Sequence, residues 1–224
     1  MLGDNFRGAD KGNAVAAKLI SLDLVALCCA ASAASACQKT TNPVFEDNFK
    51  NADPGWGQPD NNAAFTPNGL VLTPPVSGSA WRSNANLTMA QGDWCIREVN
   101  PSNLPTPADE EAVGAVGVWF WGSDLQNFYT ATITLDGKAS IDRLNHGIWQ
   151  TVVPPAPAPS VNTSPGAANE IEIVTSGNTA TFYVNGVRIT NITGRPPANG
   201  GSPGVYAESG PKGTSWLIPH VALY

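Results

Sequence analysis

Two glutamates stand two positions apart in an alternating stretch of the chain, and such a pair can carry out acid–base chemistry. In Glu170-Ile171-Glu172-Ile173 the side chains alternate between the two faces of a predicted strand, so both carboxyl groups lie on one face. Paired carboxyl groups of this kind cleave glycosidic bonds, one as the acid and the other as nucleophile or base. The alternative is two solvated carboxylates on an exposed sheet face, and Glu170 and Glu172 are therefore weak catalytic candidates.

Aromatic side chains provide a second kind of candidate site, which binds rather than cleaves. Flat rings stack against the apolar faces of sugars, and the chain has 7 tryptophans for this purpose. The stretch 116–121 alternates, which predicts that Trp119 and Trp121 share one face of a strand. The alternative is that these tryptophans fill the core. The predicted ligand-binding residues are Trp119, Trp121, Asn127, Tyr129, Arg143 and Trp149.

The remaining polar residues show no pattern of a metal or cofactor site. His146 lies in a predicted turn and His220 near the end of the chain, without the spacing of a zinc or Ser-His-Asp motif. The acidic run Asp109-Glu110-Glu111 falls in a predicted loop, where a solvated surface is favoured over a metal site. No metal and no cofactor are predicted, although a structural calcium ion is left open.

The net charge of the chain limits the kinds of partner that it can bind. The formal net charge is −6 and the sequence pI is about 4.8. Nucleic acids and anionic membranes need concentrated Lys and Arg, so both are excluded as partners. A neutral polysaccharide or oligosaccharide is more compatible with this net negative charge.

The elements that must position these residues are strands. The chain contains 22 Gly and 19 Pro, and its turn signals recur at the spacing of an all-β protein. Asn185-Gly186 predicts a tight hairpin, and 169–175, 179–184 and 187–191 predict three consecutive strands. Such a unit cannot bury its apolar face alone, which predicts a two-sheet antiparallel β-sandwich. The run 154–159, rich in proline, is predicted to be a stiff surface connection.

The first 36 residues resemble a signal peptide. Basic residues precede an apolar run that ends in Ala34-Ser35-Ala36, an A-x-A cleavage pattern. The run is too short to span a bilayer. A single domain, 37–224, would then be secreted or periplasmic. A short helix retained in the mature protein is the alternative.

Cleavage before Cys37 leaves Cys37 and Cys95 as the cysteines of the mature chain, which predicts a disulfide between them. This bond would fix the N-terminus against the predicted strand 94–99. A lipid on Cys37 is the competing hypothesis.

A series of short motifs along the second half resembles a known group of domains. The motifs include Asn127-Phe128-Tyr129, Asp136-Gly137, Tyr183-Val184-Asn185-Gly186 and Ser202-Pro203-Gly204-Val205-Tyr206. They resemble extracytoplasmic bacterial domains of the concanavalin A-like, laminin-G-like jelly roll, among them the 3-keto-disaccharide hydrolase family. The resemblance covers about half of the chain and implies the fold more strongly than the function.

The catalytic motif of laminarinase-type enzymes with this fold, Glu-x-Asp-x-x-Glu, is not intact here. Glu172 stands where that motif has Asp, and Thr175 stands where it has the second Glu. Three functions follow as hypotheses. The first is glycan binding without catalysis, the second is cleavage of glycosides as in the 3-keto-disaccharide hydrolases, and the third is a structural or interaction role in the cell envelope.

Overall fold

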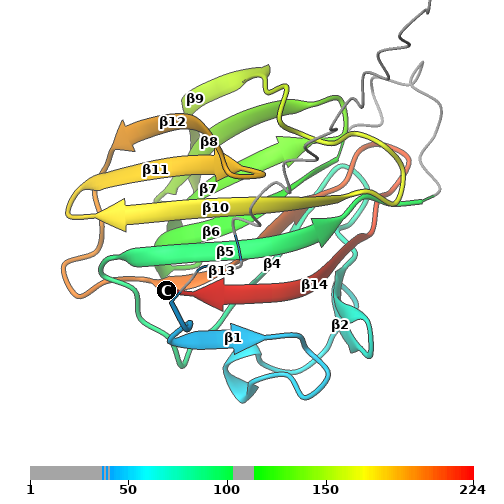
Figure 1. Ribbon diagram of the computed structural model, residues 1–224, viewed down its shortest axis with the longest axis horizontal. Helices are drawn as coiled ribbons and strands as arrows, with labels where there is room; N and C mark the ends of the chain where they lie inside the picture. The colour runs from blue at the N-terminus through cyan, green and yellow to red at the C-terminus, as the bar shows by residue number, and fades with distance from the viewer. Residues whose placement is uncertain (1–36, 38, 40, 103–113) are drawn as a thin grey trace, which may run out of the picture. The chain divides into compact units, whose positions relative to one another are not determined.

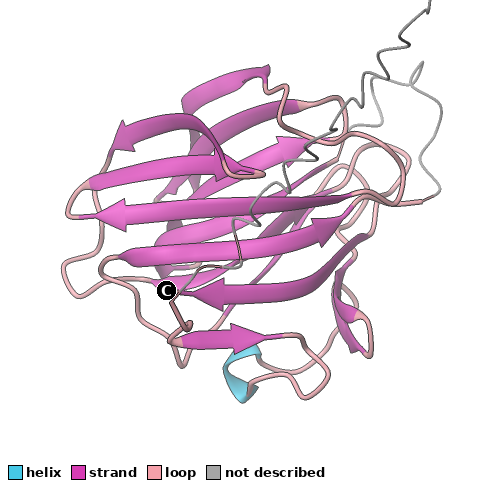
Figure 2. Cartoon of the chain, in the orientation of Figure 1, coloured by secondary structure: helices cyan, strands magenta, loops and turns pink. Residues whose placement is uncertain are grey.

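The computed structural model describes residue 37, residue 39, residues 41–102 and residues 114–224, and these described residues belong to one compact unit. Strands dominate the described residues, and two antiparallel sheets are stacked face to face (Figures 1 and 2). The predicted all-β sandwich is confirmed. The predicted signal segment 1–36 and the acidic run 109–111 lie outside the described residues.

One sheet has eight strands. Seven of them follow the order β12-β11-β10-β5-β14-β3-β2, and β1 pairs with β14. The strands are β1 Phe45–Asp47, β2 Ala63–Thr66, β3 Gly69–Leu72, β5 Gly92–Val99, β10 Ala168–Ser176, β11 Thr179–Val184, β12 Val187–Thr193 and β14 Trp216–Leu223.

The other sheet has six strands in the order β4-β13-β6-β7-β8-β9. The strands are β4 Ser79–Ser83, β6 Ala115–Asp124, β7 Asn127–Thr134, β8 Lys138–Asn145, β9 Ile148–Pro157 and β13 Ser202–Glu208. Consecutive hairpins join β6 to β9, whereas β13 enters between β4 and β6 from far along the chain (Figure 1).

The core lies between the sheets and follows from the alternation of the strands. Ile171 and Ile173 of β10 are fully buried there, and Phe182 and Val184 of β11 join them, as predicted. Burying one such side chain stabilises the fold by roughly 1.5–3 kcal/mol. The apolar face of β10 and β11 therefore packs on the second sheet.

The structure differs from the sequence-based prediction in three places. The run from Pro154 belongs to strand β9 up to Pro157, and not to a connection, because an edge strand leaves one side of its backbone unpaired and tolerates proline. Strand β2 had no predicted counterpart. Residues 87–89 are apolar enough to predict a short edge strand, but the structure has only a single bridge there, between Met89 and Gly201.

The predicted disulfide joins Cys37 to Cys95 of β5, with Cα atoms 5.4 Å apart. It fixes Cys37 against β5, as expected. Because the bond occupies the sulfur of Cys37, that atom is not available to carry a lipid, and the competing hypothesis is wrong. No helix within the described residues is both long and apolar enough to cross a membrane.

Candidate functional site

Trp119 and Trp121 lie on opposite faces of the six-stranded sheet, so the prediction of a shared face is wrong. The register between β6 and β7 shifts after Phe120, and Trp121 has a φ of 49°. A bulge of this kind re-aims the side chain that follows it. Trp121 therefore enters the core between the sheets, whereas Trp119 remains on the outer face.

Tyr129 packs beside Trp121 in the core. The two ring centroids are 5.3 Å apart and nearly perpendicular, and the Tyr129 hydroxyl accepts the backbone N–H of Arg195 at 3.2 Å. Gly194 adjoins both rings, since a Cβ atom there would lie 2.4 Å from the Trp121 indole. These contacts give Trp121 and Tyr129 a packing role.

Arg143 and Asn127 are also engaged within the protein. The Arg143 guanidinium lies 5.2 Å from the centre of the Tyr129 ring, across the β7–β8 pair. Asn127 donates from Nδ2 to both carboxylate oxygens of Asp124 and accepts the backbone N–H of His146, which ties two turns together. Of the six predicted ligand-binding residues, the outer face brings together Trp119 and Trp149.

That outer face carries a cluster of five aromatic rings, here called the aromatic face. Trp119 and Phe128 stack with centroids 3.6 Å apart, and Trp81 stacks on Trp119 at 6.1 Å. Trp149 meets Phe128 edge-on at 5.5 Å and Tyr206 at 5.9 Å. Trp119 and Tyr206 are buried, whereas Trp149 remains 46% exposed.

Tight curvature of the sheet brings these rings together. Trp149 of β9 and Tyr206 of β13 are separated by three strands, a span of roughly 19 Å on a flat sheet. Two glycines permit the curvature, because a Cβ atom on Gly117 would lie 2.0 Å from the Ala131 carbonyl oxygen, and one on Gly204 would lie 2.4 Å from the Arg82 carbonyl oxygen. The sheet therefore folds its outer side chains toward one another.

Two carboxyl groups accompany the aromatic face. The Tyr206 hydroxyl donates to Glu208 Oε1 at 2.8 Å. Burial, with the nearby charges of Glu208 and Asp142, raises the pKa of Tyr206. Burial also raises the pKa of Asp142, partly offset by hydrogen bonds from Thr151 and Ser140. Neither carboxyl has a salt-bridge partner in the described part of the chain.

Hydroxyl groups complete the polar lining. Thr132 and Ser140 lie opposite each other on β7 and β8, and their oxygens are 3.1 Å apart. Thr130 lies beside them, opposite Asp142. Among the residues that the structure describes, no three His, Cys, Asp or Glu side chains gather as a metal site.

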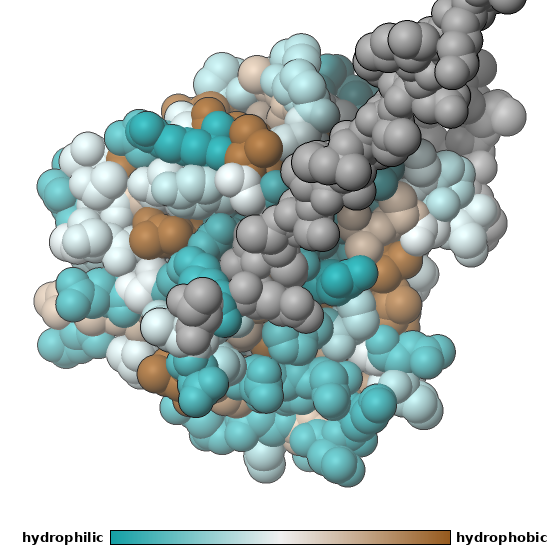
Figure 3. All heavy atoms as spheres, viewed as in Figure 1, coloured by the Kyte–Doolittle hydropathy of each residue, from teal (hydrophilic) through white to brown (hydrophobic). Residues whose placement is uncertain are grey.

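Glu170 and Glu172 lie on the other side of the sandwich, on the outer face of the eight-stranded sheet. Glu172 accepts from Lys39 Nζ at 2.6 Å, and Glu170 lies 3.8 Å from the Arg97 guanidinium. Hydrophilic residues cover much of this face, with apolar ones scattered among them (Figure 3). The pair is thus separated from the aromatic face by the whole core.

Sequence reasoning missed Trp81, Phe128, Tyr206, Asp142 and Glu208. Alternation within each strand could have placed Tyr206 and Glu208 on one face, because Val205 and Ala207 between them are apolar. No local signal could have brought β13 next to β6, since that pairing joins distant parts of the chain.

Comparisons with known proteins bear on the fold. No family model matches the sequence, and no curated protein matches it. Among solved structures, the carbohydrate-binding module CBM66 from Bacillus subtilis has a TM-score of 0.56 at 11% identity, over 73% of this chain and 91% of that one. The Bacillus licheniformis β-glucanase has a TM-score of 0.55 at 14% identity, over 83% of this chain and 99% of that one.

A prokaryotic β-1,3-1,4-glucanase (lichenase) derived from a mouse hindgut metagenome has a TM-score of 0.52 at 10% identity, over 80% of this chain and 97% of that one. Identities this low leave the likeness at the level of the fold. Together with the two antiparallel sheets, they show that the chain has a concanavalin A-like jelly-roll fold.

Proposed function

We propose that the protein is a secreted or periplasmic glycan-binding protein that holds a neutral saccharide against the aromatic face. The observation that carries this proposal is the half-exposed Trp149, whose ring packs against Phe128 and Tyr206 beside two carboxyl groups that form no salt bridge with the residues the structure describes. Its exposed side offers an apolar surface to one sugar ring, and the groups around it accept hydroxyl hydrogens.

The polar groups on this face suit a saccharide. Asp142 of β8 and Glu208 of β13 lie on the outer side of the six-stranded sheet, and the buried residues Thr130, Thr132 and Ser140 point to the same side. Hydroxyl and carboxyl groups bind sugar hydroxyls directly, whereas the net charge of −6 disfavours an anionic polymer. The known structures of the same fold include a carbohydrate-binding module and two glucanases, which supports a glycan as the ligand class.

Calorimetric titration against neutral plant, fungal and bacterial polysaccharides tests this proposal. The full-length protein is expected to bind at least one of them, and Trp149→Ala is expected to weaken that binding about tenfold or more, because the exposed stacking ring is lost. Its melting temperature should change little, since Trp149 is half-exposed on an edge strand.

Val187→Ala is the matched control. Val187 is also exposed and apolar and lies on an edge strand, but on the other sheet, so its loss should leave affinity unchanged. Absence of binding by the unaltered protein, or equal binding by Trp149→Ala, would overturn the proposal.

A second candidate function, glycoside cleavage, is favoured by the two carboxyl groups of the aromatic face. Because the pKa of Asp142 is raised, it can hold a proton for the glycosidic oxygen, while Glu208 takes a proton from the attacking water. The C–O bond breaks, and the water oxygen bonds to the anomeric carbon. Turnover should then fall at least about a hundredfold in Asp142→Asn.

The pH profile separates cleavage from binding alone. Activity of an Asp142 acid is lost as pH rises through its raised pKa, because the proton donor disappears. Hydrolysis of a 3-keto-glucoside or a β-glucan, followed by reducing-end release, measures it. Turnover that persists in Asp142→Asn would contradict the role of Asp142 as the acid, and no turnover by the unaltered protein would leave binding alone.

A further inference from the structure

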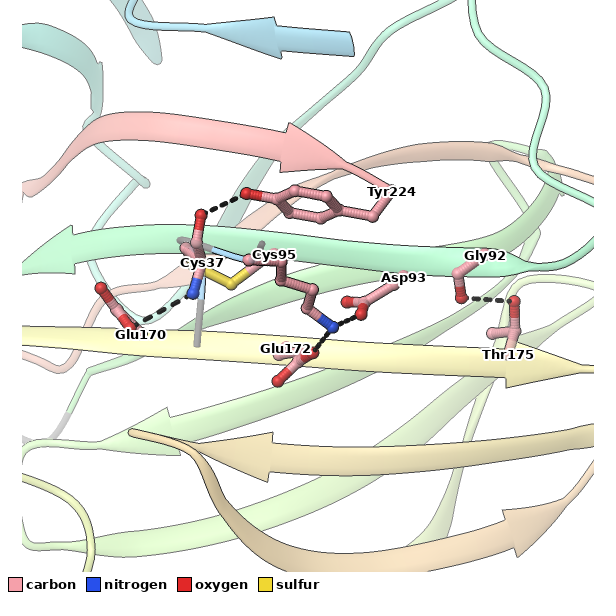
Figure 4. Close-up of polar contacts among 9 residues, drawn as sticks. Cys37, Gly92, Asp93, Cys95, Glu170, Glu172, Thr175 and Tyr224 are labelled. Carbon is pink, nitrogen blue, oxygen red and sulfur yellow. Dashed lines mark hydrogen bonds and ion pairs between the residues drawn. A yellow bond between two sulfur atoms is a disulfide. The ribbon is translucent and has the colours of Figure 1, made fainter. Parts of the chain in front are cut away.

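Lys39 lies between two carboxylates on the outer face of the eight-stranded sheet. Its Nζ atom contacts Asp93 Oδ2 of β5 and donates to Glu172 Oε1 of β10 at 2.6 Å. Figure 4 shows Asp93 and Glu172 directed toward one another from neighbouring strands. Little of either carboxylate reaches water, since the exposed fraction of the side chain is 12% for Asp93 and 7% for Glu172. One amine is thus held against two carboxyl groups that are largely enclosed.

A disulfide fixes the position of Lys39. Cys37, two residues before Lys39, is bonded to Cys95, which lies two residues after Asp93 on β5. Because both pairs have the same spacing along the chain, the bond at Cys37 sets Lys39 over Asp93. The Tyr224 ring lies close by, with its centre 5.6 Å from Lys39 Nζ. Covalent and aromatic contacts therefore keep the amine at this carboxylate.

The Asp93 carboxylate is incompletely satisfied at this place. Its Oδ1 atom is buried and has no hydrogen-bond partner among the described residues. A buried carboxylate is costly to keep ionised, whereas an amide carries no charge. An amine and a carboxyl group condense poorly in dilute solution, but groups held in reacting geometry behave as if their concentration were about 10⁵–10⁸ M. The contact between Lys39 and Asp93 therefore favours a covalent bond.

We propose that Lys39 and Asp93 condense to form an isopeptide bond, and that Glu172 carries a proton in this reaction. The Lys39 ammonium gives one proton to Asp93 Oδ2 and a second to Glu172, which passes it to the same oxygen. The nitrogen lone pair bonds to the Asp93 carboxyl carbon, the bond from that carbon to Oδ2 breaks, and Oδ2 leaves as water. The N–H that remains already has its acceptor, because Glu172 Oε1 lies 2.6 Å away.

The reaction should be slow compared with folding. A lysine amine is almost entirely protonated at neutral pH, and only its neutral form adds to a carboxyl carbon. Freshly prepared protein is therefore unlinked, and the amide accumulates with time. The amide closes nearly the same loop as the disulfide, since residues 39–93 lie within residues 37–95. Reduction consequently lowers the melting temperature of fresh protein, and lowers it less as the amide forms.

Mass spectrometry of the full-length protein, incubated at neutral pH for several weeks, tests the proposal. The intact mass should fall by one water molecule, in addition to the two hydrogen atoms lost at the disulfide. After reduction and digestion with trypsin, residues 83–97 should remain joined through Asp93 to the peptide that contains Lys39. A mass that stays constant, with Lys39 and Asp93 in separate peptides, overturns the proposal. Neither result depends on glycan binding.

Three variants, each shown to be folded by its melt when fresh, assign the roles. Lys39→Arg keeps the positive charge without a reactive amine, so it should lose no water. Glu172→Gln removes the proton carrier and should slow the loss at least about a hundredfold. Lys138→Arg is the matched control, because Lys138 also forms an ion pair with an aspartate, Asp136, and this variant should lose water as the unaltered protein does.

Two outcomes with these variants contradict the proposal. Loss of water that persists in Lys39→Arg would come from a succinimide at an aspartate, and not from an amide to Lys39. An unchanged rate in Glu172→Gln would show that Glu172 carries no proton in the reaction.

Discussion

Glu98 carries a carboxyl group that is fully buried, on the same side of β5 as Trp94 and Ile96. Asn169 Nδ2 donates to Glu98 Oε1 at 2.6 Å, while Oε2 has no hydrogen-bond partner among the described residues. Burial raises the pKa of Glu98 to about 8, and the hydrogen bond from Asn169 only partly offsets it. The folded protein therefore holds a neutral carboxyl group here at moderately acid pH.

Replacing Glu98 should change how the stability of the protein depends on pH. Between the unfolded value of 4.5 and the folded value of about 8, the native state keeps a proton that the unfolded chain releases. The free energy of unfolding therefore falls as pH rises through this window, by about 1.4 kcal/mol per pH unit and by up to about 5 kcal/mol in all. Glu98→Gln should flatten the dependence of the melting temperature on pH from 5 to 8.

Glu46→Gln serves as the control, because the Glu46 side chain is largely exposed and lies near His220 at the sheet edge. It should leave the slope nearly unchanged. A Glu98→Gln protein with the slope of the unaltered protein would show that Glu98 is ionised throughout.

At the residue scale, sequence reasoning succeeded where a side chain follows the regular alternation of its strand. It placed Ile171 and Phe182 in the core correctly. It failed at Trp121, because one residue in the left-handed region shifts the alternation and turns the ring inward. Nothing in the run of valines and tryptophans marks that bulge, since no glycine occupies the positive-φ position.

At the scale of elements, the curvature of the six-stranded sheet determines the aromatic face. Gly117 lies on its outer side, where a Cβ atom would be 2.0 Å from the backbone of β7. Gly117→Ala should separate β6 from β7, lower the free energy of unfolding by about 1–3 kcal/mol and loosen the packing of Trp119 on Phe128. Thermal melts followed by near-ultraviolet circular dichroism measure both effects.

Gly78→Ala is the matched control for this prediction. A Cβ atom at Gly78 would lie 3.3 Å from the Pro75 ring, a contact that a small shift relieves. If Gly117→Ala melts like Gly78→Ala with an unchanged aromatic spectrum, close approach at Gly117 does not set the curvature.

The presence of the strands could be predicted from the sequence more reliably than the residues at which they begin and end. The hairpins at Asp136-Gly137 and Asn185-Gly186 were found because their turns need specific residues. Strand β9 extends through three prolines that local reasoning assigned to a connection. Strand β9 can contain these prolines because it lies at the edge of the sheet, and that position depends on how the whole sheet assembles.

For the whole molecule, the disulfide joins residues 58 positions apart and is expected to contribute on the order of 4 kcal/mol by restricting the unfolded chain. Total domain stability is only about 5–15 kcal/mol. Reduction should therefore lower the melting temperature by several degrees or more. The proposed glycan binding at ordinary temperature should persist, because the aromatic face lies on the other sheet.

Melts with and without reductant, paired with mass spectrometry of the thiols, measure this contribution. The Cys37→Ser, Cys95→Ser double variant should melt like the reduced protein. Two free thiols in protein purified from an oxidising compartment, or an unchanged melt after confirmed reduction, would contradict it.

The hydrogen bond between Tyr224 and Cys37 places both of these residues on the outer side of the eight-stranded sheet. A support attached chemically at the Tyr224 side chain would therefore lie on that side. The aromatic face then looks away from the attachment. Several copies arrayed on one surface would present their Trp149 rings in the same direction, and a long polymer could engage many of them at once, with a gain in avidity that no single site supplies.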